Sequence, residues 1–211
     1  MQELNFKALN KFCTAWLQKA DRVDMDPLEG VFDRFFTLWV VFNRLYEEAG
    51  RSLVHSEHPI YAVFVSKRGK KIFTPPPDRI SATKGIVVFV GEDRLKVKIF
   101  SNDEATIGLK YIHDSILDGM LYLHENYETG KPAPEIDQDL ATKAISGSVE
   151  SILILLYQAR CNLFHGQKSF TESQRGLLNG MSAILPQIIA CSMEACPAPR
   201  VTWACAPVPQ D

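Results

Sequence analysis

The chain has 211 residues, of which 46% are hydrophobic, and a formal net charge of −2 at pH 7. This length fits one domain, or one domain with an insertion, and the apolar share is that of a globular protein. The near-zero charge argues against a protein that coats nucleic acid electrostatically, so any contact with RNA must be a local patch. With no secretory signal and no apolar run of membrane-spanning length, we expect a cytoplasmic protein without membrane association.

The first 50 residues predict two helices. Residues 3–20 place apolar side chains at helical spacing, and a second helix from Pro27 to Gly50 carries many aromatic side chains at steps of three and four. Its aromatic residues are Phe32, Phe35, Phe36, Trp39, Phe42 and Tyr46. Asn43 is a carboxamide among these rings, and two interpretations are open: a satisfied hydrogen bond in the core, or a contact with RNA at an active cleft.

The middle of the chain, about 55–104, predicts a small β insertion. The segments 60–65, 86–90 and 95–100 are rich in β-branched residues, and 95–99 alternates apolar and basic residues with a period of two. Gly91 begins a short polar break that suits a hairpin turn. The same region contains a basic cluster, which either contacts phosphates or forms a solvated loop. That cluster is Lys67, Arg68, Lys70 and Lys71.

Helical spacing returns after residue 105 and predicts three further helices. One runs from Leu109 to about residue 128, one leads from a cap at Asp137 or Asp139 through the apolar run 152–156, and one covers 177–188. Residues 196–211 predict a flexible proline-rich tail. We therefore expect an all-α fold, an antiparallel bundle of four or five helices within a single domain of residues 1–195, with a small β-hairpin insertion.

The cysteines do not predict a metal site. The five cysteines, at positions 13, 161, 191, 196 and 205, are irregularly spaced and include no CxxC pair. We expect free thiols, no metal and no cofactor.

The candidate chemistry lies in the stretch from Arg160 to Gly166. A guanidinium, a carboxamide and an imidazole occur within six residues, Arg160, Asn162 and His165, at the end of an apolar helix. Residues five apart on a helix lie roughly 140° apart around its axis. Arg160 and His165 therefore face one pocket only if the helix breaks at the glycine or a second copy of the chain completes the pocket. The alternative interpretation is an arginine that caps a carbonyl and a histidine hydrogen-bonded at a helix end.

This arrangement resembles the Arg-x4-His signature of the HEPN family, small helical proteins many of which are ribonucleases that act as dimers. The resemblance covers roughly residues 1–50 and 105–195. It implies that Arg160 and His165 from two protomers form a composite site that cleaves RNA through its 2′-hydroxyl, without a metal, to a 2′,3′-cyclic phosphate. Asn162 would orient His165 or contact phosphate, while Lys168, the basic cluster and Asn43 are candidate RNA-binding residues.

Two positions depart from the family pattern. Cys161 stands where many members have a small polar residue, and Gln167 stands where members controlled by adenylylation often have tyrosine. The alternative function is a catalytically inactive HEPN-like module that binds RNA, nucleotide or a protein partner. Whether the protein acts in toxin–antitoxin control, phage defence or housekeeping, and whether a regulatory protein partner restrains it, stays open at this point.

Overall fold

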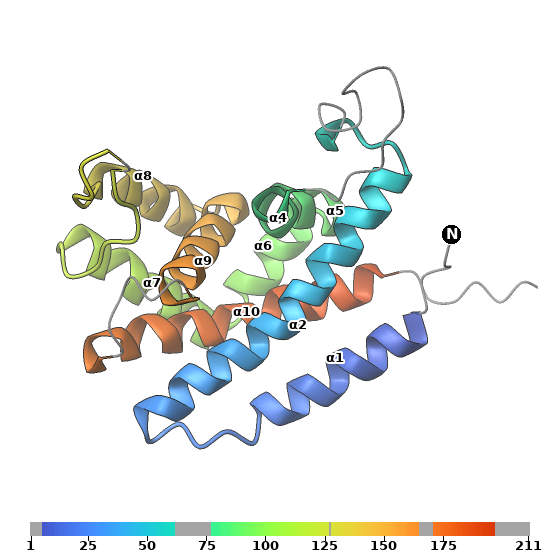
Figure 1. Ribbon diagram of the computed structural model, residues 1–211, viewed down its shortest axis with the longest axis horizontal. Helices are drawn as coiled ribbons and strands as arrows, with labels where there is room; N and C mark the ends of the chain where they lie inside the picture. The colour runs from blue at the N-terminus through green and yellow to red at the C-terminus, as the bar shows by residue number, and fades with distance from the viewer. Residues whose placement is uncertain (1–5, 62–76, 127, 165–170, 197–211) are drawn as a thin grey trace, which may run out of the picture.

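The computed structural model describes residues 6–61, 77–126, 128–164 and 171–196 (Figure 1). Helices make up the secondary structure of these residues, and one isolated bridge joins Glu125 to Pro132. The all-α prediction is confirmed for this part of the chain. The predicted tail lies almost wholly outside the described residues.

The two N-terminal helices form where the apolar spacing predicts them. Helix α1 (Phe6–Ala20) and helix α2 (Leu28–His55) run side by side in opposite directions (Figure 1). Helix α2 continues past Gly50, its predicted end, because the residues that follow still bury apolar side chains, Leu53 and Val54. Most of its aromatic side chains lie in the core, which confirms the broad buried face predicted from their spacing.

The predicted β strands over 86–90 and 95–100 are wrong, because both segments are helical. A helical stretch formed by α4 (Asp78–Ile80), the π-turn η2 (Ser81–Gly85) and α5 (Ile86–Val90) leads directly into α6 (Glu92–Phe100). The predicted hairpin turn is instead a helix break, in which Gly91 adopts a φ of +96°. The third predicted strand, 60–65, falls partly outside the described residues, and its first two residues belong to the short 3-10 helix η1 (Pro59–Tyr61).

The strand prediction for 95–100 was wrong because the spacing of its apolar residues fits both a helix and a strand. Leu95 and Ile99 are buried, and residues four apart lie on one face of a helix as well as on one face of a strand. Val97 distinguishes the two structures. In a strand it would share the buried face of Leu95 and Ile99, but its side chain is 69% exposed. The two acidic residues at the start of α6, Glu92 and Asp93, favour the helix through its dipole.

The C-terminal half contains helix α7 (Asp103–Leu117), α8 (Pro134–Ile145), α9 (Val149–Phe164), the 3-10 turn η3 (Glu172–Gln174) and α10 (Arg175–Ala195). The single helix predicted to reach the Arg160 stretch is therefore two helices, which separate at Gly147 with a φ of +103°. Helix α7 ends at Leu117 rather than near residue 128. Helix α8 begins at Pro134, so Asp137 lies in its first turn and is not the predicted cap.

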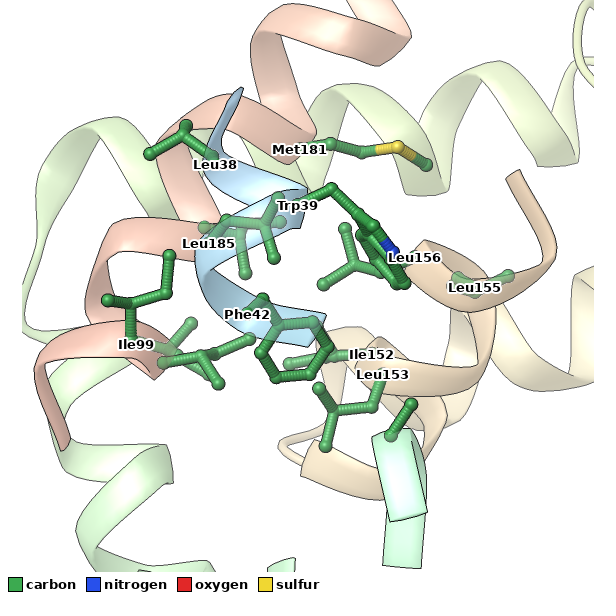
Figure 2. Close-up of a cluster of buried hydrophobic side chains, with 14 of the residues drawn as sticks. Leu38, Trp39, Phe42, Ile99, Ile152, Leu153, Leu155, Leu156, Met181 and Leu185 are labelled. Atoms are coloured by element: carbon green, nitrogen blue, oxygen red, sulfur yellow. The ribbon is translucent and has the colours of Figure 1, made fainter. Parts of the chain in front are cut away.

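The core lies where α2, α9 and α10 meet, with α6 at one side (Figure 2). Figure 2 shows Trp39 and Phe42 of α2 packed against the apolar run of α9 and the inner face of α10. The α9 side chains in this cluster are Ile152, Leu153, Leu155 and Leu156. The last turn of α9, which carries Arg160, lies against α2, where Phe164 stacks on Phe36.

One stretch, Glu172–Ala195, is long and apolar enough to cross a membrane by length and composition, because an 18-residue window within it has a mean hydropathy of 1.3. The prediction that no such run exists is therefore wrong. Within the fold 61% of that window is buried, mainly where α10 packs against α7 and α2, and core helices of soluble proteins commonly pass the same test.

Candidate functional site

Arg160 lies on the last turn of α9, half-buried against aromatic rings. Its guanidinium carbon lies 4.5 Å from the centre of the Phe164 ring, 5.8 Å from that of Trp39 and 6.0 Å from that of Tyr157. Phe36 of α2 stacks on Phe164 with a centroid distance of 4.2 Å. The rings attract the cation through their π faces and orient it without using its N–H donors.

Within the described part of the chain, the N–H donors of Arg160 have few partners. Its Nη1 lies 3.9 Å from Cys161 Sγ, and its Nε is buried without a hydrogen-bond partner among the described residues. Trp39 Nε1 beside it is likewise buried and unpartnered. No carboxylate of the described part of the chain forms an ion pair with Arg160. A guanidinium that no described carboxylate neutralises is suited to bind an anion such as phosphate.

A carboxylate and two phenols form a hydrogen-bonded cluster near this arginine. Asp78, the first residue of α4, accepts hydrogen bonds from Tyr46 of α2 at 2.6 Å and from Tyr157 of α9 at 2.9 Å. The cluster therefore ties three helices together on the side of α9 that carries Tyr157 and Arg160. Sequence reasoning missed Asp78 because its partners are 32 and 79 residues away, and no local pattern signals such a contact.

Asn43 belongs to the edge of this cluster. Its Oδ1 is hydrogen-bonded to the Tyr46 hydroxyl, and its Nδ2 donates to Glu47 Oε1 at 3.0 Å. These bonds match the first interpretation of Asn43, a hydrogen-bonded amide among aromatic side chains. A contact between Asn43 and RNA stays a prediction.

Asn162 points away from Arg160, into the protein. It is 3% exposed, its Nδ2 donates to the Leu123 carbonyl oxygen at 2.7 Å, and its Oδ1 accepts from Gln158 Nε2 at 3.0 Å. The bond to Leu123 holds α9 to the segment that follows α7, while the bond from Gln158 lies within α9. The structure does not bring Asn162 together with Arg160.

Six predicted site residues lie outside the described residues, so the structure does not place them. They are His165, Lys168, Lys67, Arg68, Lys70 and Lys71. Among the residues that the structure describes, no group of three or more His, Cys, Asp or Glu side chains is arranged to hold a metal ion.

The comparisons with known proteins give no match, whether with protein-family models, with curated proteins or with solved structures. The functional argument therefore rests on the residues of this chain.

The cluster around Asp78 predicts a pH dependence of stability. Burial, and then the hydrogen bond to Asp78, raises the pKa of the Tyr46 phenol above its ordinary value. The unfolded chain therefore loses this proton first as pH rises, so the stabilisation is complete below about pH 10 and is lost above it. Above pH 10 the free energy of unfolding of the wild type should fall with pH more steeply than that of Tyr46→Phe. The expected difference between the two slopes is about 1.4 kcal/mol per pH unit, the contribution of one proton.

Urea unfolding of both proteins between pH 8 and 11, with fluorescence detection, measures the two slopes. The comparison is between slopes, because the variant also loses a hydrogen bond and starts from lower stability. Equal slopes above pH 10 would show that the phenol is not held neutral by the fold.

Proposed function

We propose that the protein is a metal-independent endoribonuclease of the HEPN type, with Arg160 and His165 as its catalytic residues. The observation that supports this most is the state of Arg160, whose guanidinium is fixed by three rings while its donors are unpaired with any carboxylate of the described residues. A surface arginine that only stabilises a fold commonly pairs with a carboxylate or a carbonyl. Arg160 instead lies against aromatic rings and has no carboxylate partner among the described residues, which supports a role in binding an anion.

The chemistry follows from what RNA supplies. The 2′-hydroxyl beside the scissile phosphate attacks phosphorus, the bond to the 5′-oxygen breaks, and the products are a 2′,3′-cyclic phosphate and a 5′-hydroxyl. His165 takes the proton from the 2′-hydroxyl or gives one to the leaving oxygen, because imidazole titrates near neutral pH. Arg160 stabilises the charge that develops on the phosphate oxygens. Because the nucleophile belongs to the substrate, the reaction requires no metal-bound water.

The quaternary part of the proposal is a homodimer. The two-fold contact would bring Arg160 and His165 of two chains to one composite cleft, and such a contact is isologous and closed by two copies of the chain. We propose RNA as the substrate and Lys168 with the basic cluster as further phosphate contacts. A contact between Asn43 and RNA remains part of this proposal, and Asn162 supports the site by tying α9 to Leu123.

The second candidate is an HEPN-like module that binds without cleaving. The pairing of Asn162 with Leu123 favours it, since the carboxamide that would orient His165 is engaged elsewhere. Binding of RNA with no product under any condition would decide for this module.

We expect the protein to cleave end-labelled RNA in excess EDTA and to leave cyclic phosphate ends. Mass spectrometry of the products, together with a control digestion in Mg²⁺, checks both points. The control substrate is the same strand with a 2′-deoxy residue at the cut site, which lacks the nucleophile. Activity that requires Mg²⁺ or Mn²⁺, or cleavage of the 2′-deoxy strand, would contradict the mechanism.

A further inference from the structure

Two opposite charges, Asp78 and Arg160, lie near each other beside the aromatic rings without forming an ion pair. Both act on one hydroxyl group, the Tyr46 phenol. Burial, and then the hydrogen bond and the charge of Asp78, raise the pKa of that phenol, while the charge of Arg160 lowers it. Opposite charges at such a range attract each other, so the structure has to contain something that keeps these two apart.

Tyr157 contacts both charged groups. Its hydroxyl donates to Asp78 Oδ2 at 2.9 Å, and its ring centre lies 6.0 Å from the guanidinium carbon of Arg160. Tyr157 and Arg160 are three residues apart on α9, so they share one face of that helix. One side chain therefore binds the carboxylate with its polar end and packs against the cation with its ring.

The second oxygen of the carboxylate is also engaged. Tyr46, whose side chain is fully buried, donates to Asp78 Oδ1 at 2.6 Å, so each oxygen of Asp78 accepts a hydrogen bond from a phenol. Tyr46 fixes the carboxylate to α2, and Tyr157 occupies the oxygen on the side of α9. Loss of the Tyr157 hydroxyl would free Oδ2 for the guanidinium, whose N–H groups are good donors to a carboxylate.

We propose that Tyr157 is a positioning residue of an anion site: by binding Asp78 it keeps the carboxylate from pairing with Arg160, so that the guanidinium can bind a phosphate group. The identity of that phosphate as the scissile group of RNA rests on the proposed ribonuclease function. The separation of the two charges does not, since it depends on contacts among described residues.

The test measures the binding of inorganic phosphate, which presents the anion without a sugar or a base. The full chain is titrated with phosphate at millimolar concentrations and constant ionic strength, so that screening does not vary. The indole N–H of Trp39, observed by ¹H–¹⁵N NMR, reports the binding, because its ring centre lies 5.8 Å from the guanidinium carbon. Trp39→Phe assigns this signal. Arg160→Ala is expected to abolish its response to phosphate.

Tyr157→Phe keeps the ring and removes the hydroxyl. It is expected to weaken phosphate binding about fivefold, the competition expected from a new ion pair at a half-exposed position. Adding Asp78→Asn to Tyr157→Phe is expected to restore the wild-type affinity, because asparagine cannot neutralise the arginine. A tyrosine that acted only by packing would give a double variant as weak as the single one, or weaker.

Tyr46→Phe is the matched control, because it makes the same chemical change at the other oxygen of Asp78. The bond between Tyr157 and Asp78 stays, so the phosphate affinity should stay that of the wild type. If Tyr157→Phe fails to fold, Asp78→Asn alone decides. It should leave the affinity within about threefold of the wild type. A larger gain would show that Asp78 already neutralises Arg160, and a larger loss that Asp78 itself is needed for binding; either result contradicts the proposal.

Wild-type phosphate affinity in Tyr157→Phe overturns the proposal, as does a double variant that stays weak or a wild-type Trp39 signal that phosphate does not move. These outcomes are separate from the fate of the ribonuclease proposal. Cleavage of RNA, with phosphate binding that is indifferent to Tyr157→Phe, leaves the nuclease and removes the positioning role. The expected series of phosphate affinities without cleavage leaves an anion site kept open by Tyr157 in a non-catalytic module.

Discussion

Replacing Asp137 with alanine is expected to lower the free energy of unfolding by about 3 kcal/mol or more, because each donor left without its buried acceptor costs about 1–3 kcal/mol. The carboxylate is fully buried. It accepts hydrogen bonds from the Leu123 backbone N–H at 2.7 Å and the His124 backbone N–H at 3.0 Å, and its second oxygen lies 2.6 Å from His124 Nδ1. Alanine leaves these groups without their acceptor in a place that water does not reach, so the loss exceeds that of one exposed hydrogen bond.

Asp139→Ala is the matched control, two residues along the same helix. Its carboxylate is exposed and pairs with Lys143, so its removal is expected to change stability by no more than about 0.5 kcal/mol. Urea unfolding of the three proteins measures the difference. A loss below about 1 kcal/mol for Asp137→Ala would show that the segment after α7 rearranges around the missing carboxylate.

The same carboxylate supports the candidate site from a distance. By holding Leu123 it places the carbonyl oxygen that Asn162 of α9 binds. The sequence singled out Asp137 as one of two possible helix caps, because aspartate before a helical pattern is a common cap. Its partners lie 13 and 14 residues earlier, which local spacing does not reveal.

The helices themselves were predictable, because their signals are local. The aromatic spacing of α2 and the apolar run of α9 predicted long buried helices, and the structure confirms both. The β insertion was not predictable in the same way. In Leu95 to Ile99 the buried residues are compatible with either period, and the difference depends on whether Val97 finds a second apolar surface, which tertiary packing decides.

The site shows the same division between local and distant signals. The Arg160 stretch was found from the sequence because its polar residues are concentrated at the end of an apolar helix. The role predicted for Asn162, to orient His165 or contact phosphate, stays a prediction. Residues two apart on a helix lie about 200° apart around its axis, so the carboxamide of Asn162 faces away from Arg160. Trp39 orients the guanidinium by direct contact, and Phe36 does so through Phe164. Both rings come from a helix more than a hundred residues earlier, and their spacing predicted only a core.

Replacing Arg160 with alanine is expected to reduce the rate of RNA cleavage at least about 10³-fold, in line with the removal of a group that stabilises transition-state charge. The same change should cost little stability. The guanidinium has no ion pair with a described carboxylate, and its contact with Phe164 at 4.5 Å is worth about 0.5–1 kcal/mol at a partly exposed position. A large loss of rate with a small loss of stability separates chemistry from folding, and single-turnover cleavage with thermal unfolding of the same samples measures both.

Arg160→Lys sharpens this prediction, because it keeps the charge and removes the planar fork. Lysine presents a point charge that neither stacks on Phe164 in the same way nor contacts two phosphate oxygens, so the rate should still fall at least about tenfold. Arg94→Ala is the control, since this arginine pairs with Glu194 on α10, away from the aromatic cluster, and its loss should leave cleavage unchanged.

If millimolar guanidinium ion partly restores the rate of Arg160→Ala but not of Arg160→Lys, whose side chain fills the space, the vacated position is where the charge acts. Wild-type cleavage by Arg160→Ala would instead assign the arginine to the packing of α9 against α2, and the non-catalytic module would then be the better account of the site.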